Sequence, residues 1–279
     1  MMIARLLILL TVILYASGCS WLGEKEDETK DWSASRFFSE AKQEMASANY
    51  AEAVKLFEKL QARYPFGRYA QQAQLEIAYA HYKNDEADQA IAAADRFIRT
   101  YPRHPFVDYA YYVKGLANYS RGVGILEKLM PSDPTRTDTS TALRSFNDFA
   151  ELVQKFPDSK YAEDARQRML FLRNNLAEYE VNVGVFYLER KAYIAAANRG
   201  KYVVENFSRT PAVERALALM SEAYIELGMQ DLAQDSQRIL AVNYPDSPYL
   251  ARLDALRNGE EAPIIDERPS ITSMLWDLL

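Results

Sequence analysis

Residues 38–65 read FSEAKQEMASANYAEAVKLFEKLQARYP, and their pattern decides the fold. Apolar residues recur with a period near 3.6, which places them on one face of an α-helix. Ala41 and Ala53 are small where two such helices would cross, and Tyr50 begins the second of them. Pro65 ends the pattern because proline cannot continue a helix. The stretch therefore predicts two amphipathic helices that pack as a hairpin.

The same pattern returns along the chain, and no stretch has a convincing β-strand pattern. Each return closes on an aromatic residue followed by a breaker, at Tyr64-Pro65, Tyr101-Pro102, Phe156-Pro157, Phe207-Ser208 and Tyr244-Pro245. The 37 residues from Pro65 to Pro102, and again from Ser208 to Pro245, accommodate two helices and two turns. The longer middle intervals require insertions. A helical solenoid is the favoured interpretation, and an irregular helical bundle is the alternative.

These blocks resemble the tetratricopeptide repeat (TPR), in which small residues stand where paired helices cross and a proline follows the second helix. The last block matches best, with Ala216, Tyr224, Gly228, Ala233 and Pro245 in place. The resemblance implies an all-α fold, a right-handed superhelical solenoid of about five TPR-like helix hairpins.

The TPR-like helical array is assigned to residues 35–257. Its third hairpin places Gly115 at the helix crossing and carries an insertion at 121–139. We expect an extra helical stretch at 161–175 before the fourth hairpin, and a capping helix at 247–257. Small residues at such crossings let helix axes approach to about 8–10 Å.

The composition excludes several classes of function. Lys and Arg number 33 against 39 Asp and Glu, a net charge of −6, so no overall positive field exists to attract nucleic acid. The single cysteine excludes an internal disulfide framework and a cysteine-based zinc cluster. Neither a Gly-x-Ser-x-Gly nor an HExxH motif occurs. We expect no enzyme, no metal and no cofactor beyond a covalent lipid.

The first 19 residues have the features of a bacterial secretory leader. One positive charge precedes an apolar run from Leu6 to Leu14, which is too short to span a bilayer. Ala-Ser-Gly then precedes Cys19, and this resembles the lipobox at which lipoproteins are cleaved and lipidated. We expect a signal peptide at 1–18 and a lipidated Cys19. A cleaved leader with an incidental cysteine is the alternative.

Both ends of the predicted array carry segments of a different composition. Residues 19–34 are rich in charge and poor in apolar side chains, as in a tether. Ser20 follows the cysteine, and the absence of Asp there favours the outer membrane by resemblance to lipoprotein sorting rules, with the folded body in the periplasm. The tail at 258–279 ends in the apolar stretch from Met274 to Leu279. This segment is equally consistent with a docking helix and with a frayed terminus.

In the TPR family, the first helices of the hairpins line a concave groove. Carrying the groove positions over residue by residue selects Phe38, Lys42, Met45, Leu75, Tyr79, Tyr82, Lys83, Tyr109, Tyr112, Leu116 and Tyr119. The set is strongly aromatic and includes lysines, so it suits an extended peptide that carries an aromatic side chain and a carboxylate. Interhelix packing is the alternative for each residue.

Several loop and turn strings are more specific than the repeat. The chain contains Tyr64-Pro65-Phe66-Gly67, the stretch from Asp95 to Tyr109 that includes Arg96-Phe97-Ile98-Arg99 and His104-Pro105, Phe171-Leu172-Arg173 and Asn198-Arg199. In this order the strings resemble the BamD (ComL) family, lipoproteins of the outer-membrane β-barrel assembly (BAM) machinery. The resemblance covers about residues 35–245.

The resemblance implies a non-catalytic subunit with three kinds of partner: the POTRA domains of the insertase BamA, the small BAM lipoproteins, and the C-terminal signals of unfolded barrel precursors. Asn198 and Arg199 are the candidates for the BamA contact, although a solvated helix-face arginine is equally consistent with the sequence. An envelope TPR lipoprotein that serves as adaptor for a cell-wall synthase or hydrolase is the alternative function.

The two histidines are candidates for metal or base chemistry by residue type alone. His81 stands next to Tyr82 on an expected helix, and His104 lies in a turn. Neither has a second metal ligand nearby in sequence, whereas a metal site needs three or four converging ligands. We therefore expect both to be structural histidines.

Overall fold

The computed structural model describes residues 28–121 and 139–263. The predicted signal peptide, Cys19, most of the tether, the insertion except its two ends and most of the tail lie outside these residues. Within them the chain forms eleven helices and no strand. The helices are α2 (Ala34–Ala46), α3 (Tyr50–Arg63), α4 (Arg68–Lys83), α5 (Ala87–Thr100), α6 (Val107–Arg121), α8 (Thr139–Lys155), α9 (Ala162–Glu189), α10 (Tyr193–Asn206), α11 (Ala212–Glu226), α12 (Gln230–Asn243) and α13 (Tyr249–Asn258).

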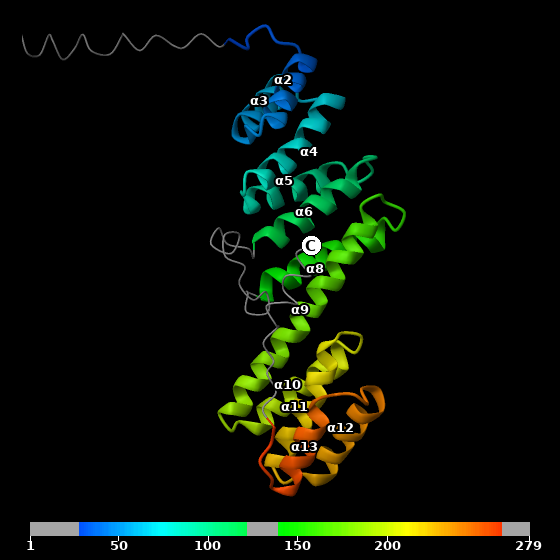
Figure 1. The fold of residues 1–279 in the computed structure, drawn as a ribbon. Coiled ribbons are helices and arrows are strands. Elements are labelled where there is room, and N and C mark those ends of the chain that lie inside the picture. The colour runs from blue at the N-terminus through cyan, green and yellow to red at the C-terminus, as the bar shows by residue number, and fades with distance from the viewer. Residues whose placement is uncertain (1–27, 122–138, 264–279) are drawn as a thin grey trace, which may run out of the picture.

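Consecutive helices pack as antiparallel hairpins that stack into an elongated array (Figure 1). The hairpins are α2–α3, α4–α5, α6–α8, α9–α10 and α11–α12, and α13 closes the last one. The expectation of an all-α helical solenoid is confirmed. Among the described residues, no helix combines the length and apolarity that crossing a bilayer requires.

The first helices of neighbouring hairpins contact one another: α2 meets α4, α4 meets α6, α9 meets α11 and α11 meets α13. No pair of second helices makes comparable contact within the described part of the chain. Closer spacing on one side bends a stack toward that side. The first helices therefore form the inner face of the array, as the TPR resemblance implies.

The hairpin turns repeat one backbone conformation. Ala48, Asp85 and Lys191 each have φ of 60°, and Gly228 takes φ of 71° at the equivalent point of its own hairpin. Left-handed backbone costs a residue with a side chain about 1–2 kcal/mol, so three of the four turns hold a strained residue. After each second helix the chain breaks at an aromatic residue such as Tyr64, Tyr101 or Tyr244.

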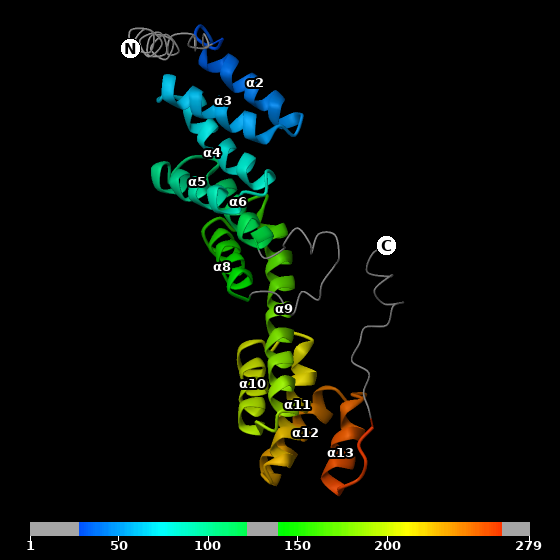
Figure 2. The same cartoon turned by 90° about the vertical axis from the view of Figure 1, so that its left-hand side faces the viewer.

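Helix α9 differs from the expectation. The sequence predicts a separate helical stretch at 161–175 and then the first helix of the fourth hairpin, but the structure has one 28-residue helix. No proline or glycine occurs between Ala162 and Gly184 to end it. Its N-terminal part packs with α8 through Leu172, and its C-terminal part packs with α10 through Val181 (Figure 2). One continuous helix thus joins the two halves of the array.

Two glycines, Gly115 and Gly200, stand at close crossings between helices. A Cβ on Gly115 would lie 2.6 Å from Cε1 of Phe149, so the predicted glycine crossing between α6 and α8 is confirmed. A Cβ on Gly200 would lie 2.7 Å from the carbonyl oxygen of Ala216. Gly200 was not predicted at a crossing, because its close neighbour lies on α11 of the next hairpin and not within its own.

Candidate functional site

Tyrosine rings from α4, α6 and the start of α9 meet on the inner face and form a continuous aromatic surface. We call Tyr79, Tyr82, Tyr109, Tyr112 and Tyr161 the tyrosine ladder. Ring centroids are 6.2 Å apart for Tyr79–Tyr82, 6.1 Å for Tyr79–Tyr109, 5.1 Å for Tyr109–Tyr161 and 4.7 Å for the stacked pair Tyr112–Tyr161. Aromatic pairs at such separations attract beyond their buried area. The ladder is therefore a preformed surface.

The structure separates the predicted groove residues into three groups. Six aromatic residues are half-buried, with part of each side chain open to solvent: Phe38, Tyr79, Tyr82, Tyr109, Tyr112 and Tyr119. Lys42 and Lys83 are exposed. Tyr161 was not predicted for the groove, because it lies in the expected extra helical stretch at 161–175, to which no groove positions of the repeat apply.

Three predicted groove residues are wrong. Met45 is only 8% exposed, Leu75 is 6% exposed and Leu116 is 7% exposed. Met45 packs in the core of the first hairpin, whereas Leu75 and Leu116 belong to the core around Phe149. Residues one turn apart on a helix share a face only approximately, so these side chains turn toward the neighbouring helix instead of the open side.

The two ends of the aromatic surface carry charged pairs. Lys42 Nζ lies 2.9 Å from Glu76 Oε1, so one of the two predicted lysines already has an acidic partner. At the other end, the hydroxyl of Tyr112 donates to Asp164 Oδ2 at 2.7 Å, and Arg168 Nε donates to the same oxygen at 2.6 Å. The Arg168 guanidinium lies 5.4 Å from the ring centre of Tyr119. This end of the ladder therefore presents a guanidinium beside aromatic rings.

The pKa values of these groups are shifted in different directions, down for Asp164 and up for Tyr112 and Tyr109. Burial alone would raise the pKa of Asp164, but the hydrogen bonds from Arg168 and Tyr112 outweigh it and hold this pKa below its ordinary value. Burial, followed by the hydrogen bond to Asp164, raises the pKa of Tyr112 to about 12. Burial also raises the pKa of Tyr109.

We expect the tyrosine ladder to make the protein less stable in alkali. A phenol whose pKa is raised in the folded state stabilises the fold fully below its unfolded pKa of about 10, and this contribution is lost as the pH rises through the folded value. The free energy of unfolding should therefore fall from pH 10 to pH 12, as measured by urea unfolding. Tyr112→Phe should reduce this loss, and an unchanged pH dependence in that variant would contradict the assignment.

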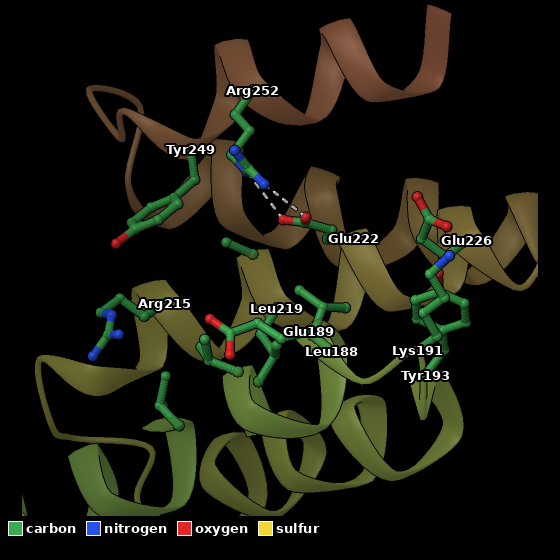
Figure 3. Close-up of a pocket in the computed structure, with 13 residues that line it drawn as sticks. Leu188, Glu189, Lys191, Tyr193, Arg215, Leu219, Glu222, Glu226, Tyr249 and Arg252 are labelled. Carbon is green, nitrogen blue, oxygen red and sulfur yellow. Dashed lines mark hydrogen bonds and ion pairs between the residues drawn. The ribbon is translucent and has the colours of Figure 1, made fainter. Parts of the chain in front are cut away.

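A second concave site lies on the inner face of the C-terminal half, between α9, α11 and α13 (Figure 3). The pocket has a volume of about 530 Å³ and an apolar wall that includes Val185, Leu188 and Leu219. On its rim, Arg252 donates to both carboxylate oxygens of Glu222, at 3.1 and 2.8 Å. Its lining residues are up to 71 positions apart in sequence, so no local motif could have indicated it.

Asn198 and Arg199 lie on α10 and follow closely in sequence on Tyr193, which lines this pocket. Their own side chains do not line it and lie on two different surfaces. Asn198 is exposed and lines a shallow pocket with Ile194 and Leu227. Arg199 Nη1 donates to Glu180 Oε2 of α9 at 2.7 Å, and this hydrogen bond raises the pKa of the guanidinium. Arg199 is thus held across the α9–α10 hairpin and remains partly exposed.

The two histidines have structural contacts. His81 Nδ1 lies 2.6 Å from Glu86 Oε2, and this hydrogen bond lowers the pKa of Glu86. His104 Nδ1 accepts a hydrogen bond from the backbone N–H of Phe106 at 3.2 Å. The first contact joins the end of α4 to the turn that follows, and the second lies within the turn between α5 and α6, in agreement with the expected structural role.

Comparison with known proteins assigns the family. A family model described as YfiO, outer membrane lipoprotein, matches residues 30–240. The chain is 42% identical over 249 residues to the outer membrane protein assembly factor BamD of Neisseria meningitidis serogroup A, covering 88% of this chain and 93% of the relative. It is 38% identical to BamD of Xylella fastidiosa (88% and 83% covered) and 36% identical to BamD of Vibrio cholerae (81% and 92% covered). Because these matches span nearly the whole helical array, the chain belongs to the YfiO family of outer membrane lipoproteins, whose relatives bear the name BamD.

Proposed function

We propose that this chain is a non-catalytic lipoprotein subunit of the outer-membrane β-barrel assembly complex. In this role it scaffolds the insertase BamA and binds the C-terminal signals of unfolded barrel precursors. Its relatives are named outer membrane protein assembly factors. The observation that supports binding of barrel precursors is the half-buried tyrosine ladder on the inner face. The ladder offers aromatic surface to a ligand without any unfolding of the protein.

The chemistry of the ladder suits the proposed cargo. A barrel precursor ends in an aromatic residue and a free carboxylate, as the family resemblance implies. Tyrosine supplies a large apolar contact and a hydroxyl at small entropic cost, so the ladder can hold the terminal ring. Arg168 at one end and the exposed Lys83 near the other are cations close to the ladder, and of these Arg168 already pairs with Asp164, as Lys42 does with Glu76.

The proposed location follows from Cys19. Lipid attached to this residue would hold the protein at the outer membrane, with the helical array in the periplasm. Each buried methylene of an acyl chain contributes about 0.8 kcal/mol, so two or three chains give a lasting anchor.

The proposed contact with BamA lies in the C-terminal half, at Asn198 and Arg199. The ion pair between Arg199 and Glu180 fixes the guanidinium in one place while leaving part of it accessible. Such a preordered cation loses little entropy on pairing with an acidic group of a partner. The small BAM lipoproteins are further proposed partners, without assigned residues.

Peptide binding tests the cargo proposal. Tyr79→Ala is expected to weaken binding of a peptide that ends in phenylalanine by about tenfold, or about 1.4 kcal/mol, because it removes the ring that joins α4 to α6 in the ladder. Fluorescence anisotropy with a labelled peptide measures the affinity. The matched control is Tyr202→Ala, which removes an exposed tyrosine from the second helix α10. Equal affinities for all three proteins would remove the ladder from the proposal.

Isolation of the lipidated protein from membranes distinguishes the proposed function from the adaptor alternative. The assembly role requires a barrel protein of the insertase type in stoichiometric amount, whereas the adaptor role requires a cell-wall synthase or hydrolase. Arg199→Glu should reduce recovery of the insertase. The control is Arg238→Glu, which makes the same change at an exposed arginine.

A further inference from the structure

The chain enters the array through a short segment that is bound tightly to the first hairpin. We call residues 28–33 the strap. Arg63, at the end of α3, donates through Nη1 to the carbonyl oxygens of Thr29 and Lys30. The hydroxyl of Tyr64 donates to the carbonyl oxygen of Trp32 at 2.8 Å. The Trp32 ring also packs against Phe37. The strap therefore enters the array beside the end of α3.

The loop that follows α3 carries the most exposed large apolar side chain of the described residues. Phe66 is 89% exposed and lies only two residues after Tyr64. Pro65 restricts the backbone before it, and Gly67 takes φ of 95° after it, a conformation that favours glycine. The loop thus holds the phenyl ring outward. The strap and this loop lie at the same end of the first hairpin (Figures 1 and 2).

Chain length limits how far this loop can be from a lipid on Cys19. Nine residue steps separate Cys19 from Glu28, and a fully extended chain spans at most about 3.6 Å per step. The first residue of the strap therefore lies within about 32 Å of the lipidated residue, whatever path the chain takes between them. Most of the array has no such constraint.

We propose that Phe66 contacts the phospholipid surface to which Cys19 is anchored, so that the loop forms a second, non-covalent membrane contact. The inference rests on the lipid anchor of the proposed function. Aromatic side chains favour the membrane interface, where the ring leaves water. Arg36 and Arg68 are both exposed near the loop, and their guanidinium groups stack 4.5 Å from the ring centre of Trp32 and 4.8 Å from that of Tyr69. They can meet lipid phosphates from these positions.

A membrane contact explains the position of Phe66 better than a protein contact does. The lipid brings a bilayer close to this loop in every molecule, because the strap holds the start of the array beside the loop. Val242 on α12 is nearly as exposed, at 76%, but it lies in the last hairpin, far along the array from the strap (Figure 1). It is the matched control.

The experiment uses the full lipidated protein in vesicles of phosphatidylethanolamine and phosphatidylglycerol. Because Cys19 is the single cysteine and its sulfur would carry lipid, Phe66→Cys and Val242→Cys can each be labelled uniquely with an environment-sensitive fluorophore. We expect a blue shift of the label at position 66 and loss of its emission when the vesicles contain a lipid-borne quencher. The label at position 242 should show neither change. Loosening the strap with Arg63→Met and Tyr64→Phe should reduce both effects at position 66.

Each contrary outcome is distinct. If the protein floats with the vesicles while the label at position 66 behaves as it does in solution, the lipid contact of Phe66 is refuted and the anchor stands. If the protein does not float with the vesicles, the anchor and the inference that rests on it both fail. If the label at position 66 responds only after an insertase is added, the loop binds protein and the inference is overturned.

Discussion

Phe149→Ala is expected to lower the free energy of unfolding by about 3–5 kcal/mol, the usual cost of deleting a fully buried phenyl ring. Phe149 has no exposed surface, and its ring packs on Gly115 and 6.1 Å from the ring of Tyr112. The loss should therefore also disturb one end of the tyrosine ladder. Urea unfolding followed by circular dichroism measures it. The control is Phe171→Ala, whose ring is 47% exposed and whose loss should cost much less.

A double-mutant cycle tests the reason for this cost. Gly115→Ala alone should cost about 1–3 kcal/mol, because the new methyl group would lie 2.6 Å from the Phe149 ring. In a Phe149→Leu background that ring is absent, so the same change should cost less. We expect a coupling of about 0.5–3 kcal/mol between the two positions. Strict additivity would show that this crossing is not limited by the contact between Gly115 and Phe149.

Cys19→Ser is expected to abolish membrane attachment and to leave the fold unchanged. The substitution removes the sulfur that would carry the lipid, and the anchoring free energy of about 0.8 kcal/mol per methylene is lost with it. The protein should move from the membrane fraction to the soluble periplasmic fraction, as measured by fractionation and immunoblotting. Circular dichroism of the released protein should show the same helical content.

The matched control for this variant is Ser20→Ala, which changes the next side chain and keeps the cysteine. A Cys19→Ser protein that stays with the outer membrane would show that contacts with partner proteins suffice to hold it there. In that case the lipid would not be required for attachment.

The helices and their order could be predicted from local pattern. Helical periodicity and the breakers at Pro65, Pro102 and Pro245 are properties of neighbouring residues, and they predicted most helix ends closely. Gly115 could be placed at a crossing because the TPR pattern requires a small residue there. The exception was α9, where the repeat pattern predicted a break although no residue in the chain causes one.

The functional surfaces were predictable only in part. An aromatic inner face follows from tyrosines that recur on first helices, and six of the predicted aromatic residues are half-buried there. The burial of Met45 and Leu75, the entry of Tyr161 into the ladder and the pairing of Lys42 with Glu76 were not predicted. The pocket between α9, α11 and α13 was not predicted either.

The sequence by itself determined that this protein is a stack of helix hairpins of the YfiO family, because periodicity, breakers and loop strings are short-range features that can be recognised in the sequence alone. Only the tertiary structure decided which side of each first helix faces its neighbour and which remains open. That choice depends on the rotation and spacing of helices packed against one another, and a register difference of one residue rotates a side chain by about 100°, which is enough to move it from the inner face into the core.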